Sequence, residues 1–235
     1  MAALLAIFTF GFFVTLEVVL SHRRAAAQRA TATVPAPART PSVPMPEAVE
    51  PVWVAGYQFP EDLHYHLGHT WARAVGPDTV AVGMDDFASR LTGPAQRLEV
   101  PDAGSWVQQG SDTFRVDSDG RSAHLVSPVD GEVVEVNPEL KSDPTLSTKD
   151  PYRRGWICTV RVPGIAANLR NLLSGRMARR WIEETRDQLE LRLMALSGSV
   201  LQDGGEPARD FARHLDTKDW NVLVEGFLLT KVDQD

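Results

Sequence analysis

The sequence is poor in three features that point to common functions: cysteine, lysine and clustered positive charge. Its single cysteine, Cys158, excludes an internal disulfide, is compatible with a reducing compartment and has the apolar neighbours typical of a strand. A net charge of -7, with no stripe of Lys and Arg, argues against a nucleic-acid partner. Lysine occurs at four positions in the whole chain: Lys141, Lys149, Lys218 and Lys231.

Common catalytic and metal-binding motifs are missing as well. There is no Gly-rich phosphate loop, and Ser127 lacks the surroundings of a nucleophile elbow. Asp85 and Asp86 are neighbours that point apart on a helix, so we expect capping or solvation rather than acid-base work. The three histidines of HYHLGH (64–69) could share a strand face around a metal, but no cysteine or carboxylate cluster completes a site, and structural histidines are the favoured interpretation. The sequence predicts no catalytic residue, no metal and no cofactor.

A long apolar run is present near the N-terminus. Residues 2–20, AALLAIFTFGFFVTLEVVL, contain one charged residue, Glu17, and as a helix would cover roughly 28 Å, about one hydrocarbon core. Positive charge follows the run at residues 22–24, which favours an uncleaved anchor over a cleavable signal peptide and keeps the C-terminal side in the cytoplasm. We therefore expect residues 1–22 to be a single-pass anchor in the cytoplasmic (inner) membrane, with the N-terminus outside. Glu17 would either reach the interface or contact a partner helix.

Beyond the anchor, the sequence predicts a linker and then a small antiparallel β structure. Residues 23–52 are rich in Pro and Ala and should form an extended tether. Short apolar-rich runs separated by Gly, Pro, Asp and Asn follow, which is the pattern of strands joined by turns. The expected strands are 79–84, 96–100, 112–116, 131–136 and 156–162, with a short helix at 84–91.

Helical periodicity replaces this alternation after residue 163. We expect helices at 168–175 and 176–196, the second amphipathic. Arg176, Arg179 and Arg180 form either a solvated face or a site for an acidic partner. The stripe expected on the amphipathic helix consists of Met177, Trp181, Thr185, Leu189 and Leu193.

The last part of the chain, 197–235, is expected to be a helical tail. Its helices should cover 208–215 and 218–229, with Thr217 as the N-cap of the second. Trp220 and Phe227 lie at helical spacing in that second helix. Their stripe is either core or a face that docks on a partner.

Five segments, in order, closely resemble the H-protein of the glycine cleavage system, and they cover about half of the chain. The resemblance implies a fold that is mainly β with C-terminal helices, built on a flattened β-sandwich of the lipoyl/biotinyl type over residues 53–175. It also implies a lipoyl-lysine that carries an aminomethyl group between partner enzymes. The segments are HTW (69–71), VAVGMDDFASRL (80–91), LEVPDAGSWVQQG (98–110), SPVDGEVVEVNPEL (127–140) and DPYRRGW (150–156).

The chain departs from the family at the lysine. In the family this lysine lies on a hairpin before the Ser-Pro-Val turn, but FRVDSDGRSAHLV (114–126) contains none, and the position falls on Gly120 or Arg121. Asp119-Gly120 is a strong signal for a two-residue hairpin turn of the primed type. Arg121 cannot be lipoylated, because a guanidinium with a pKa above about 12 is neither deprotonated nor nucleophilic.

We therefore expect a non-catalytic, membrane-anchored H-protein-like domain that serves as an accessory or structural subunit. Its partner would be an integral-membrane protein complex, plausibly a photosynthetic or respiratory assembly, with residues 2–20 in the bilayer. The alternative is an active lipoyl-type group carrier. The candidate partner contacts are Glu17, Arg121, Trp181, Trp220 and Phe227.

Overall fold

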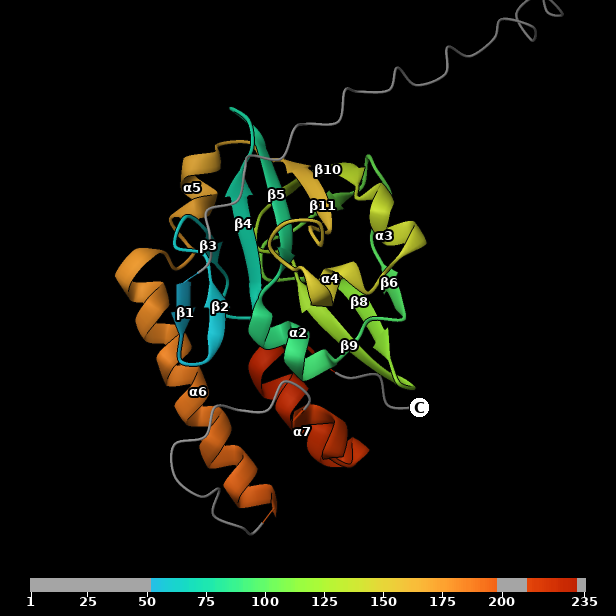
Figure 1. Cartoon of the computed structure of the whole chain (residues 1–235). Helices are drawn as coiled ribbons and strands as arrows, with labels where there is room; N and C mark the ends of the chain where they lie inside the picture. The colour runs from blue at the N-terminus through green and yellow to red at the C-terminus, as the bar shows by residue number, and fades with distance from the viewer. Residues whose placement is uncertain (1–51, 198–210, 232–235) are drawn as a thin grey trace, which may run out of the picture. The chain divides into compact units, whose positions relative to one another are not determined.

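The computed structural model describes residues 52–197 and 211–231 of the chain (Figure 1). The expected anchor, Glu17 and nearly all of the expected linker lie outside these ranges. Within them, no helix is both long enough and apolar enough to cross a bilayer.

Two sheets and a short ribbon make up the β part. The larger sheet has the strand order β3-β4-β5-β11-β10-β7, the smaller sheet has the order β6-β8-β9, and β1 pairs with β2. Every strand pair in them is antiparallel. The strands are β1 (Val52–Val54), β2 (Tyr57–Phe59), β3 (His64–Tyr65), β4 (Thr70–Ala74), β5 (Thr79–Met84), β6 (Arg97–Glu99), β7 (Trp106–Val107), β8 (Asp112–Ser118), β9 (Arg121–Val126), β10 (Gly131–Val136) and β11 (Cys158–Arg161).

Alternation along the strands places one face of each sheet in a shared core. In β8, Phe114, Val116 and Ser118 are buried while the residues between them are less so. Residues of both sheets belong to one buried cluster, in which Trp71 is fully enclosed and donates from Nε1 to the Met84 carbonyl at 2.8 Å. A Cβ on Gly83 would clash with the Trp71 ring, so the close approach of these neighbouring strands requires glycine there.

The strand predictions agree with the structure in different degrees. Strands 79–84 and 131–136 are confirmed as β5 and β10, and three others are displaced by one or two residues at an end as β6, β8 and β11. The strand β4 was not predicted, because it is buried on both faces at four of its five residues and so shows no alternation. Mainly β with C-terminal helices is the observed fold class.

The helices are short apart from two. They are α2 (Asp86–Thr92), α3 (Pro138–Ser142), α4 (Leu146–Lys149), α5 (Ile165–Leu169), α6 (Gly175–Ser197) and α7 (Thr217–Leu228), with a 3-10 helix η1 (Phe211–His214). The prediction of a helix at 168–175 was wrong: α5 ends at Leu169, and Leu173 instead exchanges two backbone hydrogen bonds of 2.8 Å with Tyr65.

Two details of the long helices also correct the sequence predictions. The cap of α7 is Asp216, whose side chain accepts from the Asp219 amide at 2.8 Å, so Thr217 is already helical. On α6 the fully buried positions are Ala178, Ile182, Thr185 and Leu189. Thr185 and Leu189 are thus confirmed as part of the buried stripe, whereas in the first turns Ala178 and Ile182 are buried in place of Met177 and Trp181, and Met177 is 70% exposed.

Candidate functional site

The hairpin between β8 and β9 turns at Asp119 and Gly120, as the sequence predicts. Ser118 pairs with Arg121 across the turn, and the two turn residues have positive φ of 49° and 75°. Positive φ at both central residues is the geometry of the primed turn. A Cβ on Gly120 would meet no atom within 4 Å, so the tip projects into open space. The hairpin turn is therefore intact, but Gly120 has no side chain that could carry a group at this position.

Arg121, the other residue at the expected lysine position, binds the C-terminal segment, by which we mean residues 211–231. Its Nη1 donates to the Ala212 carbonyl at 3.1 Å and its Nη2 to the Leu215 carbonyl at 2.6 Å. The guanidinium also lies 5.5 Å from the centroid of the Trp220 ring. The Ala212 carbonyl also accepts from the Leu215 amide at 3.4 Å, so Arg121 adds a charged donor at the end of η1. Arg121 is therefore engaged within the chain, and its contact with a partner stays a prediction.

The C-terminal segment packs on α2 and on the hairpin strand β9 (Figure 1). Trp220 is 2% exposed, and its Nε1 donates to the Leu91 carbonyl at the end of α2 at 2.9 Å. The Thr230 hydroxyl donates to the His124 carbonyl of β9 at 2.9 Å. These contacts tie both ends of α7 to the β domain, by which we mean residues 52–174 with their strands and short helices.

Phe227 lies on the same buried face of α7. It is 5% exposed, and its ring centroid is 4.9 Å from that of Phe87 on α2. Burying a large aromatic ring stabilises a fold by about 1.5–3 kcal/mol, which explains why these rings turn inward. Of the two interpretations of this stripe, burial of both rings supports the core, and a role of Trp220 and Phe227 in contacting a partner stays a prediction.

Trp181 packs against aromatic rings on one side and lines a surface hollow on the other. It is half-buried on α6, with its ring 4.7 Å from His69 and 6.1 Å from Tyr65. Together with Leu67 and Leu229, each 53% exposed, it lines a hollow of about 220 Å³. Part of its surface is therefore accessible from outside.

The remaining charged and ligand-type residues of the sequence analysis are engaged in structural contacts. On α6, Arg179 pairs with Glu61 and Arg180 with Glu184 at 3.0 Å. Asp85 and Asp86 do point apart: Asp85 accepts from the Ala88 amide at 2.8 Å, whereas Asp86 pairs with Arg90 at 2.7 Å.

The three histidines of HYHLGH have separate environments. His69 is buried, and its Nδ1 lies 2.7 Å from the Asp85 carboxylate. His66 accepts from the Gly68 amide at 3.0 Å, and burial lowers the pKa of both His64 and His66 below the ordinary value. The described ranges contain no group of three His, Cys, Asp or Glu residues placed to hold a metal ion.

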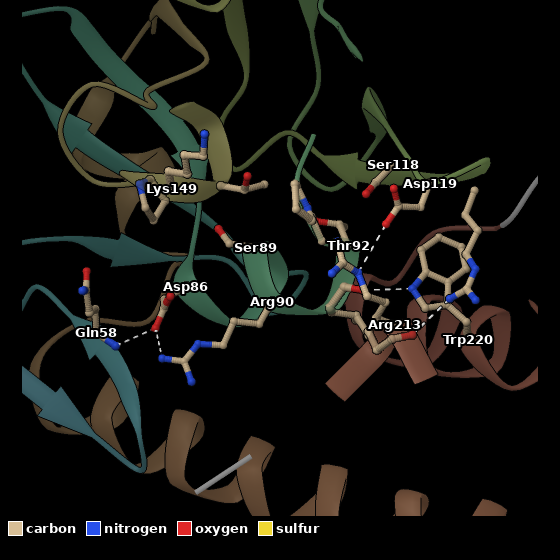
Figure 2. A pocket seen from close by; sticks show the side chains of 17 residues that line it. Gln58, Asp86, Ser89, Arg90, Thr92, Ser118, Asp119, Lys149, Arg213 and Trp220 are labelled. Carbon is tan, nitrogen blue, oxygen red and sulfur yellow. Dashed lines mark hydrogen bonds and ion pairs between the residues drawn. The ribbon is translucent and has the colours of Figure 1, made fainter. Parts of the chain in front are cut away.

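A pocket lies under the hairpin tip, between β2, α2, α4 and the C-terminal segment (Figure 2). Its volume is about 370 Å³. Two ion pairs stand in its walls, Asp86–Arg90 at 2.7 Å and Asp119–Arg213 at 3.6 Å. The sequence analysis did not identify this site, because its walls come from five separate stretches of the chain and follow no local spacing.

Comparison with known proteins locates the similarity in the β domain and the first half of α6. A family model described as "Glycine cleavage H-protein" matches residues 63–185. A glycine cleavage system H protein of Mycobacterium avium (strain 104) is 39% identical over 108 residues, 46% of this chain and 82% of the relative. One of Anaeromyxobacter sp. (strain K) is 35% identical over 127 residues, 54% of this chain and 98% of the relative. The crystal structure of a glycine cleavage system H protein from Mycobacterium marinum aligns at 27% identity over 54% of this chain and 98% of that chain, with a TM-score of 0.46.

Proposed function

The chain belongs to the glycine cleavage H-protein family, and from this premise we propose that it is a non-catalytic binding module that has lost the carrier chemistry of the family. The proposal depends on which residues form the hairpin tip. Gly120 and Arg121 stand where the resemblance implies a lysine, and Arg121 is bonded to the Ala212 and Leu215 carbonyls. A tip held in this way has shape and charge to offer to a partner, but no amine.

The lipoyl group that the family implies does not fit this hairpin. An amide to lipoate forms on a neutral primary amine, and a guanidinium does not supply one. Three of the four lysines of the chain lie in α4, in α7 and just after α7, and the fourth is Lys141 in α3. None of them is on β8 or β9, so none can present a lipoyl arm at the hairpin tip.

We further propose that the module is an accessory subunit of an integral-membrane protein complex in the cytoplasmic membrane, such as a photosynthetic or respiratory assembly. The apolar run 2–20 with positive charge after it supports a single-pass anchor with the domain on the cytoplasmic side. The large sheet also ends in β7, an edge strand on which Trp106 is 63% exposed. Exposed tryptophans are enriched at protein interfaces, and Trp106 is the contact we would test first.

The test is purification of the native full chain from its own membranes in a mild detergent, followed by mass spectrometry of the proteins that remain bound. Co-purification in fixed ratio with one integral-membrane assembly is expected, and Trp106→Ala should reduce the recovery of that assembly. Leu191→Ala, at a residue that is 67% exposed on α6, is the matched control and should leave recovery unchanged. Recovery of the chain alone, or with soluble glycine cleavage enzymes, would refute the accessory role.

An active group carrier is the second candidate, because the relatives named above are glycine cleavage system H proteins and the hairpin turn is intact. Intact-mass measurement of the native protein separates the two functions. The unmodified mass is expected for the binding module. A lipoyl adduct, located by peptide mapping to one of the four lysines, would establish the carrier instead.

A further inference from the structure

The pocket under the hairpin tip is lined by a serine hydroxyl that has no partner among the described residues. Ser118, the last residue of β8, is 4% exposed and lines the pocket. Its side chain forms no hydrogen bond with any residue in the described ranges, and its Oγ lies 3.1 Å from where a Cβ on Gly93 would stand. Figure 2 shows Ser118 beside Asp119 at the edge of the pocket. Because the Ser118 hydroxyl faces the pocket and is not used within the described residues, it is available as a hydrogen-bonding group for a polar ligand.

The pocket also carries an excess of positive charge. Its lining includes four cations and two carboxylates, and two of the cations, Arg90 and Arg213, are paired with Asp86 and Asp119. The other two are Arg121, whose hydrogen bonds go to the uncharged carbonyls of Ala212 and Leu215, and Lys149, which is in no ion pair with the described residues. An anion would compensate this charge.

The rest of the lining restricts the kind of anion. Leu91, Pro94 and Ala212 present apolar surface between the charged groups, and Trp220 closes one end. The two carboxylates in the walls would repel a second negative charge on the ligand. A volume of about 370 Å³ is at the lower end of the range for small-molecule sites.

From these observations we propose that the pocket binds a small monocarboxylate with a short apolar body. The carboxylate lies at the hairpin end, near the Ser118 hydroxyl and the guanidinium groups of Arg121 and Arg213, so that the uncompensated charge of Arg121 adds to that of Arg213. The apolar body lies along Leu91 and Pro94. This site is independent of the accessory role proposed above, because it depends on the pocket residues alone.

Occupancy of the pocket is coupled to the C-terminal segment. Ala212, Arg213 and Trp220 belong to that segment, whereas the opposite walls belong to the β domain, α2 and α4. A ligand that touches both sides binds the docked arrangement more tightly than an undocked one, and so stabilises docking. The ligand would thereby strengthen the contact between Arg121 and the segment.

Calorimetric titration of the full chain in a mild detergent tests the site, with the detergent alone as the blank. Hexanoate is the probe, 1-hexanol has the same apolar body without charge, and inorganic phosphate has charge without the body. Saturable binding of one hexanoate is expected, with at least ten-fold weaker binding of hexanol and phosphate. Absence of saturable hexanoate binding, or equal binding of hexanol, would overturn the proposal.

Variants locate the binding to this pocket. Arg213→Gln should weaken hexanoate binding about ten-fold and Ser118→Ala about five-fold, because each removes one group that contacts the carboxylate. Arg180→Gln, at an 81% exposed arginine of α6, is the matched control and should bind like the parent. Wild-type affinity in both pocket variants would refute the assignment.

Two further measurements separate loss of the site from loss of the fold. The melting temperature of each ligand-free variant reports whether it folds, and Lys149→Gln, at an exposed residue, provides a second pocket variant if Ser118→Ala unfolds. Hydrogen exchange of residues 217–228 should slow at least three-fold on addition of hexanoate in the parent and not in Arg213→Gln. Unchanged exchange in the parent would contradict the coupling to the C-terminal segment.

Discussion

The β domain and the C-terminal segment are held in different ways. The β domain contains two sheets, and its largest side chains, such as Trp71, are enclosed by many strands. The C-terminal segment depends on a few contacts between residues far apart in sequence: Arg121 to Ala212 and Leu215, and Trp220 to Leu91. It also lies after residues 63–185, which the family model matches. We therefore expect the β domain and the C-terminal segment to have separable stabilities.

The largest effect is expected from Trp220→Ala, which should remove the C-terminal segment from the β domain. The change deletes a buried ring, its hydrogen bond to Leu91 and the surface under Arg121, a loss of about 3–5 kcal/mol. Hydrogen exchange should become fast in 211–231 while β5 and β10 remain protected. Trp106→Ala, at a 63% exposed side chain, is the control and should change neither. Loss of protection throughout the β domain would show that the two regions form one cooperative unit.

The reciprocal change, Gly131→Ala, should damage the β domain itself. A Cβ on Gly131 would clash with the Arg161 carbonyl of the paired strand β11, and backbone atoms cannot move aside as a flexible side chain can. We expect a loss of about 3 kcal/mol in the free energy of unfolding, measured by urea denaturation.

Gly76→Ala is the matched control for this substitution. A Cβ there would stand 3.5 Å from the Thr79 Cβ, which is an ordinary contact, and its effect should be below about 0.5 kcal/mol. Equal effects of the two substitutions would mean that the sheet can adjust at Gly131 and that the clash is not decisive.

The sequence predicted elements of the β domain that local chemistry encodes, but not the contacts between the β domain and the C-terminal segment. Strands β5 and β10 and the Asp119–Gly120 turn follow from local chemistry, namely apolar runs between turn residues and the preference of Gly and Asp for positive φ. The helix α3 was missed although it has a local signal: Asn137 caps it and Pro138 occupies its first turn.

The site itself had no comparable local signal. Arg121 contacts residues 91 and 94 positions away, and no periodicity in either segment encodes that pairing. The sequence did show that Arg121 cannot accept lipoate. It could not show that the arginine would be used inside the chain, because an unpaired arginine and an internally bonded one look alike in a sequence.

A smaller effect is expected from Arg121→Met, which keeps much of the apolar stem but removes both hydrogen bonds to the segment. Charged donors to carbonyls contribute about 1.5–3 kcal/mol when buried, and because Arg121 is half-buried we expect about 1–2 kcal/mol. The loss should appear as faster hydrogen exchange in 211–231, with no change in β5. Arg180→Met, on the exposed face of α6, is the control. An unchanged segment in Arg121→Met would mean that Trp220 and Phe227 hold it without the arginine.

The smallest effect concerns alkaline pH and belongs to the β domain alone. Burial raises the pKa of the Cys158 thiol in β11 to about 12, from an ordinary value of 9.0. Because the folded pKa is the higher one, the unfolded chain releases its proton first, so the contribution to stability is complete below pH 9 and falls as the pH rises toward 12. At pH 10 the loss from this thiol alone should be on the order of 1 kcal/mol, measured by urea denaturation at pH 8 and pH 10. The free energy of unfolding of Cys158→Ala should fall less steeply between pH 8 and pH 10. The substitution should not change the docking of the C-terminal segment, measured by hydrogen exchange with a correction for its intrinsic pH dependence. Equal slopes in the two proteins would mean that the buried tyrosines Tyr57, Tyr65 and Tyr152, whose pKa values burial also raises, account for the alkaline loss.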